Sequence, residues 1–126
     1  MKTLIASMIV FIGLIIFGVF AYYYLDYTSN TLLTQTEKIE KSIGVRNWQQ
    51  TKASYGSLNS SWNKTSTIWT VLVDHQELDN INVSMAKLKQ YINTRYLPGI
   101  TTELAELKLL IQHIPNKEAV NLKNVL

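Results

Sequence analysis

The sequence predicts an all-α protein, in which one N-terminal transmembrane helix is followed by an extracytoplasmic antiparallel bundle of about four helices. Three observations predict this fold. Residues 3–25 include no charged residue, the rest of the chain repeats apolar residues at helical spacing, and the strict alternation of strands appears over no useful length. A chain of 126 residues has room for one domain, so we expect an anchor at 1–25 and a helical bundle at 26–126.

The anchor is the apolar segment 3–25. A helix rises about 1.5 Å per residue, so this segment reaches about 34 Å, which is enough to cross a bilayer. Asp26 ends the segment. Amphipathic rings favour the membrane–water boundary, and four tyrosines cluster at this end: Tyr22, Tyr23, Tyr24 and Tyr27.

A cleaved signal peptide is the alternative for this segment. The small-residue pattern Val19-Phe20-Ala21 would serve as a cleavage site, but the apolar stretch is longer than the usual ~7–15 residues and only Lys2 precedes it. We therefore favour an uncleaved anchor. The positive-inside rule places Lys2 and the N-terminus in the cytoplasm and residues 26–126 outside, so we expect a single-pass protein of the cell membrane.

The charge balance and the absence of cysteine exclude some classes of partner and fold. The 12 basic residues of the chain, Lys2 among them, nearly balance 9 acidic ones, which gives no electrostatic case for binding nucleic acid. The chain has no cysteine, which fits an exported bacterial domain held by packing rather than by disulfides.

Helical spacing beyond the anchor predicts the first helix of the bundle. Its apolar positions step by four, three and four residues, so we expect the helix to continue from the membrane to Ile43. We expect Gly44 to be a left-handed C-cap and Asn47 to be the N-cap of the next helix. The spacing is defined by Leu32, Thr36, Ile39 and Ile43.

A three–four step over seven intervals then predicts a long amphipathic helix with an aromatic-rich stripe. A second stripe with the same spacing starts at Leu78, but it lies on a different face of the helix from the stripe that ends at Leu72. This change of face indicates a break, although a continuous curved helix would also fit. The first stripe comprises Trp48, Thr51, Tyr55, Leu58, Trp62, Thr65, Trp69 and Leu72, and the second comprises Leu78, Ile81, Met85, Leu88 and Ile92.

Two prolines punctuate the last part of the chain. We expect the third helix to end at "YLPG", because Pro98 disfavours helical backbone at Leu97 and Gly99 permits a turn. A fourth helix then runs up to Pro115, and short connections favour antiparallel neighbours. Its stripe comprises Ile100, Leu104, Leu107, Ile111 and Ile114, and the closing "NLKNVL" would be a flap that packs through Leu122, Val125 and Leu126.

The segment "WTVLVDHQELDNI", residues 69–81, groups a histidine with three carboxylates. Asp74 and Glu77 fit the D-x-x-E form of a capping box, and both charges would complement the helix dipole. His75 and Asp79 are four residues apart on one helical face, so their side chains could hydrogen-bond. This group, Asp74, His75, Glu77 and Asp79, is the candidate interaction or capping site.

Two interpretations of the histidine remain. A structural role places His75 beside Leu72 and Leu78. The alternative makes His75 and Asp79 ligands of a divalent metal together with a neighbouring carboxylate, but a zinc site normally needs three or four protein groups. In a hairpin of the last two helices, His113 would lie about 12 Å further along the axis, too far to share an ion. We therefore favour the structural role.

The aromatic residues have a similar pair of interpretations. Trp48, Trp62 and Trp69 fall on one stripe and would either line a pocket for a ligand or partner or fill the core, which we favour. Tyr91 and Tyr96 could form a smaller exposed patch. No phosphate loop, nucleophile elbow or zinc-protease spacing is present, so we expect neither an enzymatic activity nor a cofactor.

Several segments together carry a resemblance. They are "NW" (47–48), "SSW" (60–62), "DHQELDNI" (74–81), "ELAELKLLIQHI" (103–114) and "NLKNVL" (121–126). In this order they resemble a family of small single-span proteins from spore-forming and related Gram-positive bacteria, known as a domain of unknown function. The resemblance implies an anchored helical domain without enzymatic activity, and a multi-span membrane protein of the YetF type as a candidate partner.

These observations lead to two expectations of function. The first is a non-enzymatic membrane-anchored module whose extracytoplasmic bundle binds another envelope or membrane protein through the segment Asp74 to Asp79. The second is a ligand- or metal-sensing helical domain that uses the same segment, with the tryptophan stripe lining a pocket.

Overall fold

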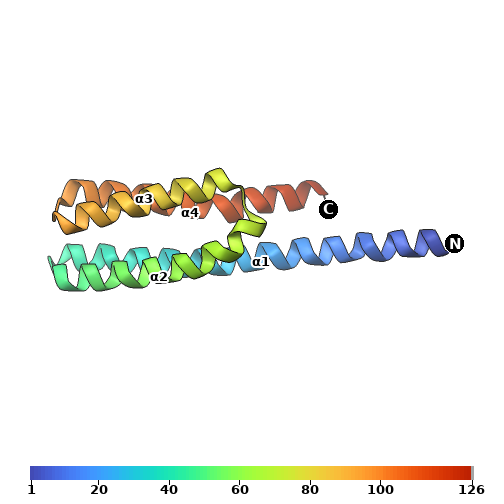
Figure 1. The fold of residues 1–126 in the computed structure, drawn as a ribbon, viewed down its shortest axis with the longest axis horizontal. Coiled ribbons are helices and arrows are strands. Elements are labelled where there is room, and N and C mark those ends of the chain that lie inside the picture. Colours follow the sequence, from blue (N-terminus) through green and yellow to red (C-terminus); the bar gives the residue numbers. More distant parts are fainter. Residues whose placement is uncertain (126) are drawn as a thin grey trace.

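The computed structural model describes residues 1–125, and in this range it contains four helices and no strand. These are α1 (Lys2–Gly44), α2 (Trp48–Leu72), α3 (His75–Asn93) and α4 (Leu97–Val125) (Figure 1). The structure confirms the predicted all-α class.

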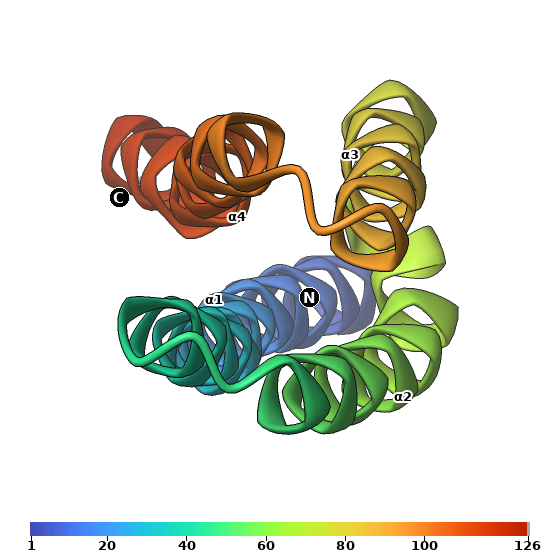
Figure 2. The same ribbon diagram turned by 90° about the vertical axis from the view of Figure 1, so that its left-hand side faces the viewer.

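The helices run up and down around a common core. Each helix is antiparallel to the next, because connections of a few residues leave no room for a crossover (Figure 1). α1 packs against α2 and α4, and α3 packs against α4 and α2, so the four helices form a ring when they are viewed end-on (Figure 2). The apolar part of α1 extends beyond this bundle. We call the end from which it extends, at the α2–α3 turn, the near end, and the opposite end the far end.

α1 joins the predicted anchor to the bundle without a break. No residue of its most apolar 18-residue window is buried, and by length and composition the helix could cross a membrane, which is compatible with a single-pass membrane protein. From Leu25 onward one side of the helix is buried, which confirms the predicted continuation to Ile43. The buried positions are Leu25, Ser29, Leu32, Thr36, Ile39, Ser42 and Ile43.

The core follows the predicted stripes. Every stripe residue of α3 and α4 is buried, as are Thr51, Leu58, Trp62 and Trp69 of α2. The other four stripe residues of α2 are half-buried, namely Trp48, Tyr55, Thr65 and Leu72. Burial of one apolar face per helix supplies the driving force for this arrangement.

The far end is closed by two backbone turns of the same kind. Each is a Schellman motif in which an arginine adopts the left-handed conformation: Arg46 has a φ of 56° and Arg95 a φ of 54°. After Arg46, the Asn47 N–H donates to the Ser42 carbonyl at 3.0 Å. The prediction for Gly44 is therefore wrong, because Gly44 is the last residue of α1 and no described glycine has a positive φ. Asn47 caps α2 as predicted.

The α3–α4 turn corrects the predicted role of Pro98. α3 ends at Asn93, before the proline, and the turn closes when the Tyr96 N–H donates to the Tyr91 carbonyl at 2.9 Å. Pro98 stands in the first turn of α4, where its missing N–H costs no hydrogen bond. Gly99 is helical, and the close approach of Tyr91 leaves no room for a side chain at this position. A Cβ there would lie 2.6 Å from Tyr91 Cδ1.

The α2–α3 turn confirms the break that the phase change indicated. Val73 has extended backbone, with φ −126° and ψ 149°, and its N–H donates to the Trp69 carbonyl at 2.7 Å. Because the backbone leaves the helix at Val73, α3 starts on a new phase at His75.

α4 continues through Pro115, so the prediction that the fourth helix ends there is wrong. Proline has no N–H, and the carbonyl of Ile111, four residues earlier, therefore lacks its helical donor. The hydroxyl of Ser29 in α1 donates to this carbonyl at 3.1 Å in a buried contact. The helix can continue because a side chain from another helix replaces the missing hydrogen bond.

The segment after Pro115 lies along the apolar part of α1 rather than folding as a flap (Figure 1). A Cβ placed on Gly18 would lie 3.6 Å from Leu122 Cδ1, an ordinary van der Waals contact. Of the predicted flap residues Leu122 is half-buried, while the side chain of Val125 and the whole of Leu126 lie outside the described residues.

Candidate functional site

The candidate segment 74–79 lies at the near end, where α3 begins. Asp74 is the N-cap of α3, and its carboxylate accepts a hydrogen bond from the Gln76 N–H at 3.1 Å. Such a bond satisfies one of the backbone donors that the start of a helix leaves unpaired. Asp74 therefore fixes where α3 begins and which way the next residues face.

Glu77 takes part in a contact that the sequence interpretation missed. Its carboxylate is 3.1 Å from Lys117 Nζ and 3.6 Å from His113 Nε2, both on α4. The hydrogen bond to Glu77 raises the pKa of Lys117. Glu77 thus joins α3 to α4, and no described side-chain hydrogen bond returns it to the backbone of Asp74 as a full capping box would.

A signal for this contact was present in the sequence. Glu77 and His113 each stand 18 residues from Arg95, the centre of the α3–α4 turn, and residues equidistant from a turn meet in an antiparallel hairpin. The sequence interpretation centred the hairpin on Pro98 and compared His113 with His75. It therefore looked for a shared metal ion and overlooked an ion pair.

His75 and Asp79 are exposed, and no hydrogen bond or ion pair within residues 1–125 involves their side chains. The predicted position of His75 beside Leu72 and Leu78 is wrong. Extended backward from Leu78, the three–four rhythm reaches Asp74 and not His75, so the histidine falls outside the buried stripe. Together with Gln76, these side chains form an exposed polar surface, which we call the 75–79 surface.

The described residues supply no further ligands for a metal ion. Within residues 1–125, no group of three or more His, Cys, Asp or Glu side chains is placed to hold one. The pair His75 and Asp79 therefore has no third protein ligand in this part of the chain, whereas zinc sites normally use three or four.

Two of the three tryptophans lie deep in the bundle. Trp62 and Trp69 meet edge to face with ring centroids 5.6 Å apart. Both indole N–H groups have partners: Trp62 donates to Asn82 Oδ1 at 2.7 Å and Trp69 to Thr28 Oγ1 at 3.0 Å. A buried indole with a satisfied N–H is a core residue, and neither cavity described below is lined by a tryptophan.

Trp48 stands apart at the far end. It is half-buried, and the guanidinium of Arg95 lies 5.7 Å from its ring centroid. The rings of Tyr91 and Tyr96 are 5.6 Å apart beside Gly99, with Tyr96 exposed. These contacts hold the two far-end turns together.

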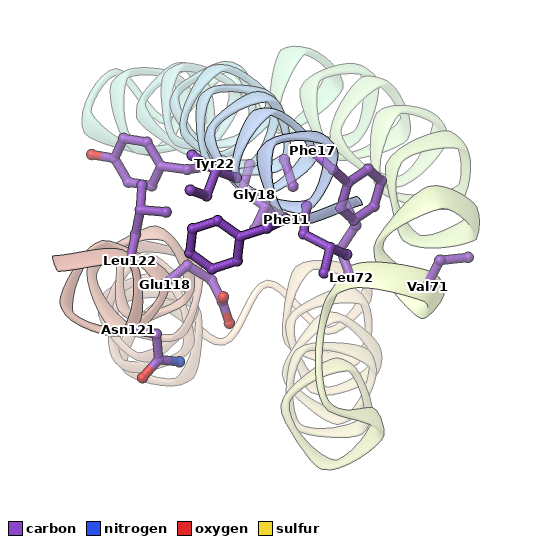
Figure 3. Close-up of a pocket in the computed structure, with 13 residues that line it drawn as sticks. Phe11, Phe17, Gly18, Tyr22, Val71, Leu72, Glu118, Asn121 and Leu122 are labelled. Atoms are coloured by element: carbon purple, nitrogen blue, oxygen red, sulfur yellow. The ribbon is translucent and has the colours of Figure 1, made fainter. Parts of the chain in front are cut away.

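Two surface cavities involve α1. One, of about 420 Å³, lies at the near end between α1, the end of α2 and the end of α4, with Phe11, Gly18 and Tyr22 on one wall and Glu118 on another (Figure 3). The second, of about 460 Å³, lies between α1 and α4 and includes the ion pair of Lys108 Nζ with Glu40 Oε1 at 3.0 Å.

Comparison with known proteins gives one match. A family model described as "Domain of unknown function (DUF4363)" matches residues 19–125. No curated protein and no solved structure matches the chain.

Proposed function

The chain belongs to this DUF4363 family, as its resemblance implied, and we propose that it is a non-enzymatic, membrane-anchored module that binds another membrane protein. In this proposal α1 crosses the cell membrane with its N-terminus in the cytoplasm, and the bundle lies outside. The excess of positive charge at the N-terminus supports this orientation.

The observation that carries the proposal is the unbroken course of α1. One helix runs from Lys2 to Gly44, first with exposed apolar side chains and then with a buried stripe. An exposed helix that is apolar on all sides needs an apolar surrounding, which a bilayer provides. A continuous helix, unlike a flexible linker, would hold the near end of the bundle close to the membrane surface.

The 75–79 surface is the part of the near end that we propose contacts the partner. The Asp74 cap and the contacts of Glu77 with α4 fix the start of α3, while His75 and Asp79 are exposed. Because the backbone here is fixed, binding to the external loops of a multi-span protein would require only the side chains of this surface to become ordered, and not the chain itself. A partner of the YetF type, which the family resemblance suggested, would present such loops.

Site-specific photo-cross-linking in native membranes tests the proposal. A photoreactive residue at Asp79 should give one adduct with a multi-span membrane protein. The same residue at Lys52, an exposed α2 position toward the far end, is the matched control and should not give that adduct. Identical adducts from both positions, or none from Asp79, would contradict the proposed contact.

A variant then tests whether the surface contributes to binding. His75→Ala with Asp79→Ala should reduce the yield of the partner when the full-length protein is purified. The fold should be kept, because both side chains are exposed and form no hydrogen bond or ion pair within residues 1–125. Gln49→Ala with Lys52→Ala is the control on another exposed surface. An unchanged yield of the partner with the first variant would contradict the proposed contact and leave the segment 74–79 with a capping role alone.

A further inference from the structure

The end of α4 reaches well into the level of the predicted span. Ser29 of α1 contacts Ile111, and Gly18 faces Leu122, so eleven residues forward on α4 correspond to eleven residues backward on α1. This constant register shows that the two helices remain side by side. Continued to the end of α4 at Val125, it reaches the level of Ile15.

This register conflicts with a hydrocarbon boundary at Leu25. A boundary there would bury the polar segment after Pro115 in the acyl chains, including the charged residues Lys117, Glu118 and Lys123. Charged side chains inside the hydrocarbon core are costly. The part of α1 that lies wholly beyond α4, residues 2–14, would by itself be about 20 Å long and too short to cross a core of about 30 Å.

We propose that the near end of the bundle lies in the headgroup layer of the bilayer, with the hydrocarbon boundary near Gly18. The membrane-embedded part of α1, residues 3–18, is then about 24 Å long, slightly shorter than the usual spanning helix, and local thinning of the bilayer accommodates such a mismatch at modest cost. Residues 19–25 and the segment of α4 after Pro115 share the headgroup layer. Lys123, near the boundary, can extend its ammonium group outward to the phosphates.

Side chains on three helices support this position. Phe20, Val71 and Val120 are 71%, 79% and 58% exposed, although they belong to α1, α2 and α4 respectively. Such apolar side chains, beside the polar residues of the α4 segment, suit a layer that is neither fully aqueous nor fully apolar. The near-end cavity has the same mixed character, because Phe11 and Phe17 line it on α1 while Glu118 and Asn121 line it on α4 (Figure 3).

Depth measurements on the full-length protein in liposomes test the proposal. The chain has no cysteine, so single cysteines introduced at exposed positions can each carry one fluorescent label. Labels at Phe20 and Val120 should be quenched most strongly by nitroxides on the lipid headgroups. A label at Leu14, about 6 Å inside the proposed boundary, should respond to nitroxides on the upper part of the acyl chains, and one at Val45, in the far-end turn, only to an aqueous quencher.

The outcomes separate this proposal from the anchoring on which it rests. A Leu14 label in water would overturn the anchoring and this inference together. If Leu14 lies among the acyl chains but Val120 is in water and Phe20 is at acyl depth, the anchor stands and the proposed boundary is wrong. Val120 at acyl depth would also overturn the boundary.

A cross-link shows whether α4 stays beside α1 in the membrane. A short thiol-reactive linker should join cysteines in the Gly18→Cys, Leu122→Cys variant. It should not join those in the Gly13→Cys, Leu122→Cys control, because Gly13 has no neighbour within 4 Å. Failure of the first pair to cross-link would mean that the segment after Pro115 leaves α1, which overturns the proposal.

Discussion

The two ends of the bundle are closed by different kinds of interaction. At the far end, two Schellman turns form backbone hydrogen bonds between residues close in sequence, with the contact of Arg95 and the half-buried Trp48 between them. At the near end, side chains join separate helices: Ser29 to Ile111, Trp69 to Thr28, and Glu77 to Lys117. Local hydrogen bonds involve a few residues close in sequence, whereas contacts between helices depend on the register of the whole bundle. The near end should therefore be more sensitive to side-chain substitution.

The largest effect should come from a pair of tryptophan substitutions. Trp69→Ala removes a fully buried ring and its bond to Thr28, and should lower the free energy of unfolding by about 3–5 kcal/mol. Trp48→Ala, at the far end, should cost less than about 2 kcal/mol because that ring is half-buried. Denaturant titrations of the full-length protein in detergent, followed by near-ultraviolet circular dichroism, measure both. Equal costs would remove the contrast between the ends.

The next largest loss of stability should come from the hydrogen bond of Ser29 to the Ile111 carbonyl, the group that Pro115 leaves without a helical donor. Ser29→Ala should cost about 1–3 kcal/mol, because the Ile111 carbonyl is left buried without a donor. In a Pro115→Ala background the restored N–H supplies that donor, so the same substitution should cost almost nothing. A double-mutant cycle from unfolding titrations measures this coupling.

Ser42→Ala is the matched control for this cycle. Ser42 is also a buried serine of α1, but its partner Thr51 keeps a hydrogen bond to the Asn47 carbonyl at 2.9 Å. Its cost should be smaller than that of Ser29→Ala and independent of Pro115. A cost of Ser29→Ala that does not change with Pro115 would contradict the proposed replacement of the helical bond.

The two far-end arginines allow a finer comparison. Arg46→Gly should stabilise the protein by about 0.5–1 kcal/mol, because the left-handed conformation is strained for any residue with a Cβ. Arg95→Gly should stabilise the protein less, because it also removes the guanidinium that lies over Trp48. That contact contributes about 0.5–1 kcal/mol. Unfolding midpoints of the two variants measure the difference, and a larger gain at Arg95 would show that the stacking contributes nothing.

The smallest effect concerns pH at the near end. The pKa of Lys117 is raised above its ordinary value of 10.5, chiefly by the hydrogen bond to Glu77. A raised pKa adds stability that is present below the unfolded-state pKa and is lost as pH rises through the folded-state value. The stability difference between the wild type and Lys117→Gln should therefore persist at neutral pH and shrink above about pH 10.5.

A comparison of melting temperatures at pH 8 and pH 11.5 measures this loss. The difference between variants cancels the titration of Tyr55, whose pKa is also raised, by burial. A difference that grows with alkaline pH would contradict the assignment to Lys117.

Much of the bundle could be predicted because its stripes are local patterns. The spacing from Leu78 to Ile92 and from Ile100 to Ile114 identified residues that are all buried. The N-cap Asn47 and the break after Leu72 also follow from short-range chemistry. The turns were harder to predict. Gly44 suggested a left-handed position and Gly99 a turn, but the left-handed positions are taken by Arg46 and Arg95, because a glycine is permitted rather than obliged to adopt a positive φ.

The candidate site shows the same limit. The D-x-x-E pattern predicted that Asp74 would cap α3, and the capping bond is present. The partner of Glu77 could not be found without the centre of the α3–α4 turn, since an error of three residues in that centre moves the paired position by six residues, which is more than one and a half helical turns. His75 was predicted to lie tucked beside Leu72 and Leu78, and its side chain is exposed, because a short segment does not define the phase of its helix.

The sequence alone determined the apolar length of α1, the number of helices in the bundle and the face that each one buries, because these depend on composition and on a period of 3.6 residues. Only the tertiary structure decided that α4 passes through Pro115, that Glu77 joins Lys117 and His113, and that the end of α4 lies beside the apolar part of α1. A proline normally ends a helix because it removes one hydrogen bond. Whether another helix supplies the missing donor depends on a contact between residues 82 positions apart, which no local pattern contains.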